Sequence, residues 1–335
     1  MPLLYLALSG VILFIACMAV KLLELKRGKA RIVDEQKNRV LKKISPFGSV
    51  EKLTVLPLVD YFSEFEGGKT EPGVSYLVRA DGQTILLDVG FNRKQEHPSP
   101  LLQNAEKLGV AFDDLDMIFI SHLHRDHVGG TANERNKHFS ISCGPVSIPP
   151  VTVYSPEAVT PLQFHSNCSV EVVAEALPLA PGVASTGPVA RQLFLMGRTV
   201  EQSLAVNVKG KGIVLIVGCG HQTIERILEE AEKIFDEPIY GVIGGLHYPV
   251  RGGRMMSRPV NILNLIGSDR PPWKHLNEQD VESGIQAIDK RGVSLVSLSP
   301  HDSSDWALDR FRQSFKERYI DLKVGHEITV TTISP

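Results

Sequence analysis

Residues 117–130, MIFISHLHRDHVGG, are the most informative stretch of this sequence. The apolar residues Met117–Ile120 predict a short buried strand. Side chains alternate along a strand, so His122 and His124, two residues apart at its end, point to the same side. Asp126 and His127 follow after a short bend. The segment therefore gathers imidazoles and a carboxylate at the edge of a sheet.

Four possible metal ligands lie within the six residues from His122 to His127. We predict two adjacent metal positions, one using His122 and His124, the other using Asp126 and His127. Neutral imidazoles and a carboxylate suit zinc, and also iron or manganese. The alternative is a polar loop with chance histidines, but the segment holds three of the chain's eleven histidines directly after an apolar strand. We therefore expect one or two ions, with zinc as the first choice.

The pattern His-x-His-x-Asp-His after a buried strand resembles the signature of the metallo-β-lactamase superfamily. The earlier segment Leu86–Gly90, LLDVG, is similar to the one that precedes this signature in the family. The resemblance covers most of residues 50–330. It implies an α/β fold of the αββα sandwich type, with the metals at one edge between two sheets. It also implies hydrolysis of an ester, lactone, amide, thioester or phosphodiester.

Two downstream motifs narrow the resemblance. Gly218–His221 (GCGH) and Gly244–His247 (GGLH) each follow an apolar strand, and Thr186-Gly187 precedes both. Together they resemble a subgroup named for a 7,8-dihydropterin-6-methyl-4-(β-D-ribofuranosyl)-aminobenzene-5′-phosphate synthase. Its members carry Gly-Cys-Ser-His and Gly-Gly-Phe-His stretches at similar places.

The resemblance implies further ligands in the second half of the chain. In much of the superfamily an aspartate at a strand end bridges the two metals, and Cys219 takes the matching position here. The alternative is a small buried residue in a tight turn. No histidine matches the one that usually completes the first metal's shell, because His138 and His165 belong to no motif. His221 either takes that role or donates to the substrate.

Two later histidines complete the predicted site. His247 lies just past a strand and is expected to bind metal, whereas His301 follows the strand 293–298 and is a metal ligand or polarises the substrate. Asp126 would hold a metal and orient the nucleophile, a metal-bound hydroxide. Asp126 and His301 are therefore the predicted catalytic residues. A Gly-x-Ser-x-Gly elbow is absent from the sequence, so no serine nucleophile is expected.

The N-terminal residues 1–20 contain no charged side chain and would span about 30 Å as a helix. The alternative to a membrane anchor is a cleaved signal peptide. A signal peptide has basic residues before its apolar run, and none precedes the run here. Nine basic and three acidic residues lie between Lys21 and Lys43, and this excess predicts a cytoplasmic main domain. We expect a single-pass membrane protein with an anchor at 1–22, a basic juxtamembrane linker, helical or extended, at 23–48 and a metallo-β-lactamase-like domain at 49–335.

Alternating apolar residues predict strands at 53–59, 74–79, 84–89, 151–154, 170–174, 203–208, 212–217, 239–243 and 293–298. Helices are expected at 100–108, 222–235, 278–291 and 304–318. Each half of the chain thus has strands and covering helices, which indicates two sheets packed face to face with helices outside.

Composition limits the partners. A net charge of -2 argues against nucleic acid, and four scattered cysteines are too few for a disulfide framework. The partners that we expect are a small-molecule substrate and the membrane. A loop after His247 is predicted to be a lid that recognises an anionic group beside Trp273, the alternatives being a solvated insert or a membrane-surface patch. Its cations are Arg251, Arg254, Arg258, Arg270 and Lys274.

Three classes of function remain open at this point. The first is a metal-dependent hydrolase with a small, anionic substrate. The second is a non-hydrolytic synthase or transferase of the dihydropterin-related subgroup, or a redox enzyme that uses iron. The third is a membrane-anchored scaffold with a vestigial metal site, against which the intact segment His122–His127 argues.

Overall fold

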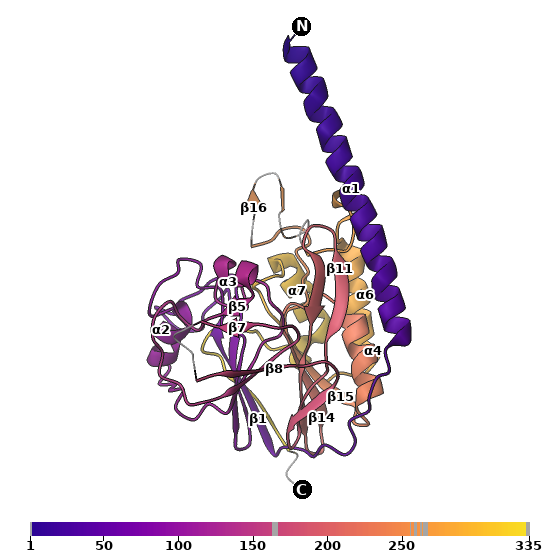
Figure 1. Cartoon of the computed structure of the whole chain (residues 1–335). Coiled ribbons are helices and arrows are strands. Elements are labelled where there is room, and N and C mark those ends of the chain that lie inside the picture. The colour runs from indigo at the N-terminus through magenta and orange to yellow at the C-terminus, as the bar shows by residue number, and fades with distance from the viewer. Residues whose placement is uncertain are drawn as a thin grey trace.

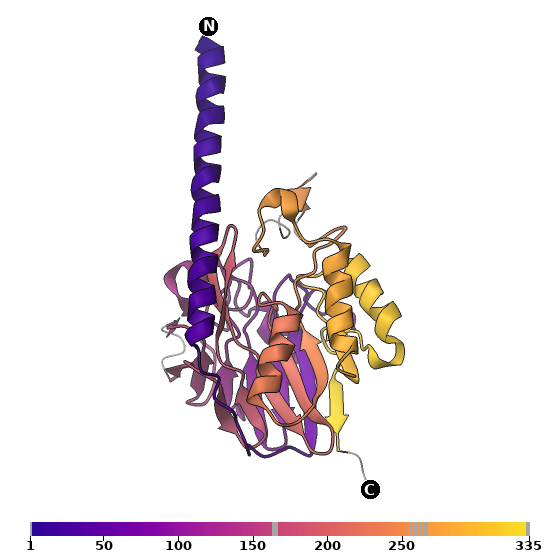
Figure 2. The same cartoon turned by 90° about the vertical axis from the view of Figure 1, so that its right-hand side faces the viewer.

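Two β-sheets lie face to face in the computed structural model, which describes residues 2–162, 167–254, 256–257, 260–261, 263 and 267–332. Helices cover the outer faces of both sheets, which gives the αββα arrangement that the sequence predicts (Figure 1). In Figure 2, helices of the C-terminal half, coloured orange to yellow, lie over the outer face of one sheet.

The first sheet is built mainly from the N-terminal half of the chain. Over the described residues its strand order is β19-β1-β2-β3-β4-β6-β8, antiparallel from β19 to β3 and parallel from β3 to β8. The bounds are β19 (Ile328–Thr331), β1 (Lys52–Val59), β2 (Ser75–Ala80), β3 (Gln83–Leu87), β4 (Met117–Phe119), β6 (Thr152–Ser155) and β8 (Ser169–Val172).

The second sheet is built from the C-terminal half. Over the described residues its order is β18-β15-β14-β13-β10-β9, and β14, β15 and β18 run parallel. The bounds are β18 (Leu295–Leu298), β15 (Ile239–Gly244), β14 (Gly212–Val217), β13 (Leu204–Val208), β10 (Val183–Ser185) and β9 (Leu177–Ala180). Smaller pairs are formed by β5 (His138–Phe139) with β7 (Thr160–Pro161), by β11 (Val189–Leu193) with β12 (Gly197–Glu201), and by β16 (Met256–Ser257) with β17 (Val260–Asn261).

The helices of the sandwich are α2 (Pro100–Lys107), α3 (Thr131–Asn136), α4 (Ile224–Ile234), α6 (Glu278–Asp289) and α7 (Asp305–Phe315), with short 3₁₀ turns at η2 (Pro272–Lys274) and η3 (Lys316–Arg318). The core between the sheets holds fully buried side chains such as Val55, Ile85, Val206 and Ile216. These residues alternate along their strands, so each sheet presents one apolar face to the other.

The predicted strands and helices are confirmed to within a few residues. Strands β9, β10 and β19 and the hairpin β11–β12 were not predicted. Strand β9 has no fully buried residue, and buried and exposed residues do not alternate along β11 and β12. The sequence therefore shows no clear strand pattern in these segments.

The N-terminal helix α1 (Pro2–Asn38) is continuous across the predicted anchor and most of the predicted linker. Among the described residues, α1 is the one helix whose length and composition would allow it to cross a membrane. Its second half lies along β11 and β12 (Figure 1).

Candidate metal centre

The side chains of the candidate site converge because they follow parallel strands. His122 follows β4, Cys219 follows β14, His247 follows β15 and His301 follows β18. The carboxyl ends of parallel neighbours meet at one edge of a sheet, and ligands bind at such edges in α/β proteins. Residues far apart in the sequence are therefore brought together at one end of the sandwich.

One buried carboxylate fixes the orientation of two histidines that follow strand β4 of the first sheet. Oδ2 of Asp88 lies 2.6 Å from Nδ1 of His127 and accepts the hydroxyl hydrogen of Ser121 at 2.6 Å. Since that hydrogen goes to Asp88, Oγ of Ser121 accepts from Nδ1 of His122 at 3.0 Å. Both histidines thus keep Nε2 for the site, as metal-binding histidines do when their other nitrogen is held.

A parallel arrangement holds His301 in the second sheet. Ser299 donates its hydroxyl hydrogen to Asp60 at 2.7 Å, so its Oγ accepts from Nδ1 of His301 at 2.6 Å. Nε2 of His301 then lies 3.2 Å from Sγ of Cys219. Asp60, which the sequence analysis did not single out, therefore positions His301 through Ser299.

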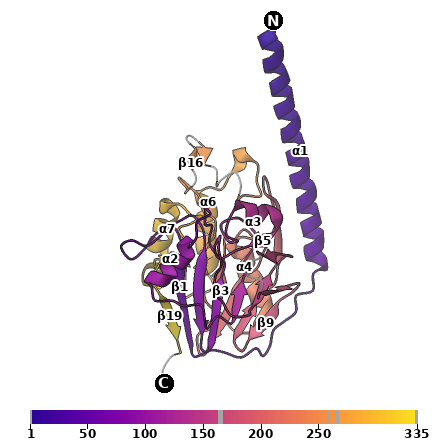
Figure 3. The same cartoon turned by 60° about the vertical axis from the view of Figure 1, so that its left-hand side comes forward.

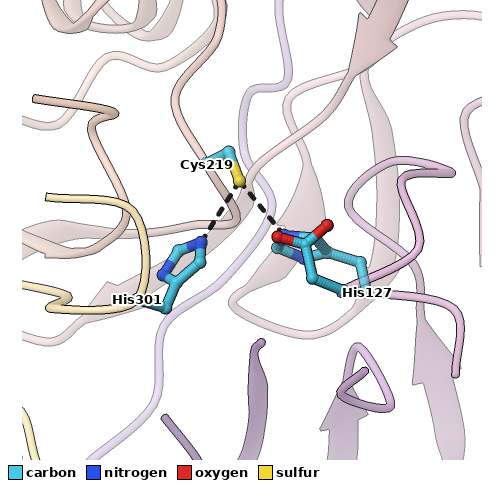
Figure 4. A group of neighbouring side chains, drawn as sticks. His127, Cys219 and His301 are labelled. Atoms are coloured by element: carbon cyan, nitrogen blue, oxygen red, sulfur yellow. Dashed lines mark hydrogen bonds and ion pairs between the residues drawn. The ribbon is translucent and has the colours of Figure 1, made fainter. Parts of the chain in front are cut away.

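Cys219 lies at the centre of the site. Its Sγ is 3.1 Å from Nε2 of His127, so the thiol lies between that ring and the ring of His301 (Figure 4). The described residues contain three sets of possible metal ligands. Within each set the ligand atoms lie within 4.8 Å of one another, and Cys219 belongs to all three sets. The sets are Asp126, His127, Cys219 and His301; His122, Cys219 and His221; and Cys219, His247 and Asp302.

Glycines and a buried glutamate shape the turn that carries Cys219. Glu201 accepts the backbone N–H groups of Cys219, Gly220 and His221 at 2.9, 2.8 and 2.8 Å. A Cβ on Gly245 would collide with the carbonyl oxygen of Gly218 and would lie 2.7 Å from Oδ2 of Asp302. The GCGH and GGLH motifs are therefore glycine-rich because two strand ends approach each other closely.

The structure brings all the predicted site residues together, and Asp126 and His127 share a set as predicted. The other predicted pair is grouped differently. His124 and His122 do not share a set; instead Nδ1 of His124 lies 3.1 Å from Nε2 of His221, and its Nε2 lies 3.4 Å from the hydroxyl of Thr199. His221 is therefore placed to take the role of the histidine that usually completes the shell of the first metal, for which the sequence offered no other motif. His138 is in β5, outside these sets, and His165 lies outside the described residues.

His247 is held at the edge of the cluster. Its backbone N–H donates to Asp302 at 2.9 Å, and its Nε2 lies 3.3 Å from the carbonyl oxygen of Leu263. The chain passes so close to the ring at Gly267 that any Cβ there would overlap Nε2. His247 has a left-handed backbone with φ of +53°, a strain that non-glycine residues accept mainly at functional sites.

Unpartnered nitrogen atoms test whether the residues fit a metal. In the described parts of the chain, the buried atoms Nε2 of His122, Nδ1 of His221 and Nδ1 of His247 have no hydrogen-bond partner. A buried polar atom left without a partner is costly, and a cation would remove that cost. Imidazole, thiol and carboxylate donors in one cluster are the donor set of a divalent metal site, so the residues fit such an ion.

Burial keeps most of the histidines neutral, as metal ligands must be. It lowers the pKa of His124 and His247 to about 4, and it holds the pKa of His122, His221 and His301 well below the usual value.

Two groups of the cluster carry a proton that a metal would replace. Burial opposes the charged form of His127, but Asp88 and Asp126 raise its pKa to about 9. Burial raises the pKa of the Cys219 thiol well above its usual value. A cation is therefore needed to hold the thiolate.

A cleft of about 500 Å³ opens beside the cluster. Asp126, His221 and His301 line it, with Arg125 and Met196 at other walls. The half-exposed carboxylate of Asp126 thus lies between the metal ligands and the space in which a substrate could bind.

Three of the cations assigned to the predicted anion-binding lid are already paired with acidic residues of the fold. Arg251, Arg254 and Arg270 are ion-paired to Glu278, Asp305 and Asp280 at 2.5, 2.8 and 2.6 Å. Arg254 also lies over the ring of Tyr61 and has a buried side chain. These three cations are neutralised by the fold itself, and Arg258 lies outside the described residues.

Sequence reasoning missed Asp60, Glu201 and Asp302 and gave Asp88 no role. Asp88 lies in the LLDVG segment and Asp302 follows His301, so both carried a local signal. Glu201 and Asp60 carried none, because their roles depend on which strand ends the fold places beside them.

Comparisons with known proteins agree with this geometry. The profile of the metallo-beta-lactamase superfamily matches residues 68–150. A 7,8-dihydropterin-6-methyl-4-(beta-D-ribofuranosyl)-aminobenzene-5'-phosphate synthase of Methanocaldococcus jannaschii is 24% identical over 312 residues, covering 83% of this chain and 97% of the relative. A ribonuclease Z of Mycolicibacterium gilvum is 31% identical over 84 residues, only 25% of this chain and 26% of that protein.

The solved structure of Tm1679, described as a metal-dependent hydrolase of the beta-lactamase superfamily, has the same fold. Its TM-score is 0.57 at 22% identity, with 83% of this chain and 99% of that chain covered. Together with the sandwich and the histidine segment, these matches show that the chain has the metallo-β-lactamase fold, that residues 68–150 match the superfamily, and that the chain is similar to the dihydropterin-related synthase.

Proposed function

We propose that this protein is a zinc-dependent hydrolase that acts on a small, anionic ester, lactone or phosphodiester. The observation that carries the proposal is the shared position of Cys219, whose sulfur belongs to every candidate ligand set. One thiolate between two groups of imidazoles can serve two neighbouring cations.

Zinc is preferred over the other candidates because of the donor set. Thiolate and imidazole ligands together favour zinc, whereas manganese favours oxygen ligands. One position would use His122, His221 and Cys219; the other would use Asp126, His127, His301 and Cys219. Zinc bound there would supply Lewis acidity and lower the pKa of a coordinated water to about 7.

The chain's own side chains then bind and orient the substrate. Asp126 faces the cleft with a carboxylate that can accept a hydrogen from a water molecule and align it. Arg125 lines the same cleft and can attract an anionic group. His301, held by Ser299, presents Nε2 toward the same point as the thiol and keeps its orientation during turnover.

We further propose that α1 anchors the protein in a membrane with the main domain on the cytoplasmic side. The uncharged run at its start and the basic residues that follow support this placement.

A synthase is the second candidate, because the similarity to the M. jannaschii protein extends over 97% of that relative. Product analysis separates the two candidates. A hydrolase incorporates oxygen from ¹⁸O-labelled water into its product, whereas an enzyme that joins two organic substrates requires both of them for turnover.

The test uses the full-length chain in detergent, the zinc content by mass spectrometry and a screen with bis(p-nitrophenyl) phosphate and p-nitrophenyl esters. We expect bound zinc and hydrolysis, both reduced by His127→Ala. His275→Ala, at an exposed histidine, is the matched control and should change neither. A protein that binds no metal, or that binds metal equally well with His127→Ala, would exclude this proposal.

A further inference from the structure

The second half of α1 is packed against the catalytic domain. Leu25 and Ile32 are buried, and Lys29 forms an ion pair with Asp269 at 2.7 Å. Glu35 pairs with Arg198 of β12 at 3.3 Å. These contacts fix the helix on the hairpin β11–β12 along several turns.

Close packing at a glycine supports the same conclusion. Any Cβ on Gly28 would overlap the side chain of Gln192 in β11, so the helix backbone lies directly on the hairpin there. Arg39, just beyond the helix, pairs with Glu230 of α4 at 2.5 Å. The helix is therefore attached at both ends of its packed half, and its direction relative to the domain is set.

The apolar half continues from the packed half within the same helix. Leu13, Phe14 and Ile15 are each at least 60% exposed, in a stretch without charges. Lys21 precedes Lys29 by eight residues, which is about 12 Å along a helix axis. A membrane surface at Lys21 would thus lie about 12 Å above Asp269.

The metal centre is at the end of the domain that faces this surface. Figures 1 and 3 show α1 projecting from the end of the sandwich where α3 and β16 lie. The rim of the cleft comes from the same end: Glu134 is in α3, Met196 is at the tip of the hairpin β11–β12, and Gly267 is in the loop after β17.

A chain of contacts places the metal centre near the level of Asp269. Arg191 bonds Asp269 at 2.8 Å and donates to the backbone carbonyl of His221 at 2.5 Å. A continuous series of contacts thus leads from α1 to the site, through Lys29, Asp269, Arg191 and His221. The polar headgroup layer adds about 5–7 Å to the hydrocarbon core on each side, so much of the distance from membrane to cleft lies within reach of a headgroup and its linker.

We propose that α1 is a rigid support that turns the cleft toward the bilayer surface, and that the substrate is an amphiphile with an anionic headgroup taken from that surface. The inference rests on the proposed hydrolytic function for its chemistry, but its geometry is independent of that function. Lys26 and Arg27, exposed directly after the apolar stretch, match an anionic lipid surface in charge.

The first experiment measures orientation. The chain has two tryptophans, Trp273 and Trp306, and Trp273 is 58% exposed in η2, in the loop that ends at α6. Trp306→Phe leaves Trp273 as the reporter in full-length protein reconstituted in vesicles of phosphatidylcholine and phosphatidylglycerol. We expect nitroxide-labelled headgroups to quench it about twofold.

The matched control moves the reporter to the other end of the domain. Gly82→Trp, combined with Trp273→Phe and Trp306→Phe, places a tryptophan in the turn before β3, at the end of the strand opposite Asp88. A Cβ at Gly82 meets no atom within 4 Å and the position is exposed, so a larger side chain can extend into solvent there. This reporter should not be quenched; equal quenching at both positions, or at neither, overturns the inference.

The second experiment lifts the cleft from the surface. Seven alanines inserted after Leu22 add about 10 Å and nearly two full turns, so the packed half keeps its contacts and its facing direction. We expect hydrolysis of hexadecyl p-nitrophenyl phosphate in the vesicles to fall about tenfold, with hydrolysis of soluble bis(p-nitrophenyl) phosphate unchanged. Quenching of Trp273 should be lost as well.

The two proposals fail in different ways. If the insertion leaves the vesicle-bound diester as good a substrate as before, the inference is wrong and the hydrolase proposal stands. If neither diester is cleaved, the hydrolase proposal fails for this class, the amphiphilic substrate fails with it, and quenching still decides the orientation of the domain.

Discussion

Oδ2 of Asp88 lies 2.6 Å from Nδ1 of His127, and both side chains are completely buried. Their contact joins the end of β3 to the histidine segment after β4, two strands that run parallel side by side. The same carboxylate also receives the hydroxyl hydrogen of Ser121, which in turn orients His122. One aspartate therefore sets the direction of two predicted ligands.

Replacing this carboxylate should weaken metal binding without removing a ligand. With Asp88→Asn, we expect zinc affinity to fall about 10- to 100-fold, because the amide supports Nδ1 of His127 less well than a carboxylate does. Competition with a chromogenic chelator measures the change. Asp114→Asn, at an exposed aspartate, is the control and should leave the affinity as it was. Unchanged affinity in Asp88→Asn would show that the contact does not orient the ring.

The shared sulfur gives a spectroscopic prediction. Cobalt bound in place of zinc should show thiolate-to-metal charge transfer in the near ultraviolet, because Cys219 belongs to every ligand set. Cys219→Ser should abolish this band and reduce the number of bound ions. Cys168→Ser, at a half-buried cysteine that is outside the described ligand sets, is the control. A band that persists in Cys219→Ser would remove the sulfur from the coordination shell.

Asp60 predicts a pH dependence of stability in the metal-free protein. Burial raises the pKa of Asp60 from 3.8 to about 7, against hydrogen bonds that favour the carboxylate. The folded state therefore binds more protons than the unfolded state between pH 4 and 7, so the free energy of unfolding falls as the pH rises through that range. Thermal melting in the presence of chelator should show this decrease.

The matched variant for this prediction is Asp60→Asn, which keeps the shape of the side chain and removes its titration. Its melting temperature should vary less with pH between 4 and 7 than that of the unmodified protein. If both proteins show the same dependence, Asp60 is not the group responsible.

Much of the site could be predicted because its ligands lie in short motifs at strand ends. The segment His122–His127, Cys219, His221 and His247 each follow an apolar run, and the chain's periodicity locates those runs. The grouping of the ligands could not be predicted in this way. His124 contacts His221 as well as His122 because two strand ends from different sheets meet there, a relation that no local pattern encodes.

The attachment of α1 is a second feature that the sequence did not reveal. Leu25, Gly28 and Ile32 are spaced to face one side of a helix, but basic residues surround them, and the segment was expected to be a charged linker. Its partner, the hairpin β11–β12, lies in a region where no strand was predicted. Because this hairpin was not predicted, the sequence did not indicate which surface the apolar side of the helix packs against.

The approach of two strand ends gives the last prediction. A Cβ on Gly245 would collide with the backbone carbonyl oxygen of Gly218, and a backbone atom cannot move aside as the end of a long side chain can. Gly245→Ala should therefore separate the ends of β14 and β15, lower the free energy of unfolding by about 1–3 kcal/mol and displace Cys219 from His301. Zinc content and thermal melting would both fall. Gly82→Ala, where a Cβ meets open space, is the matched control and should change neither. If Gly245→Ala binds zinc normally, the close approach of the two strand ends is not what holds Cys219 in the metal centre.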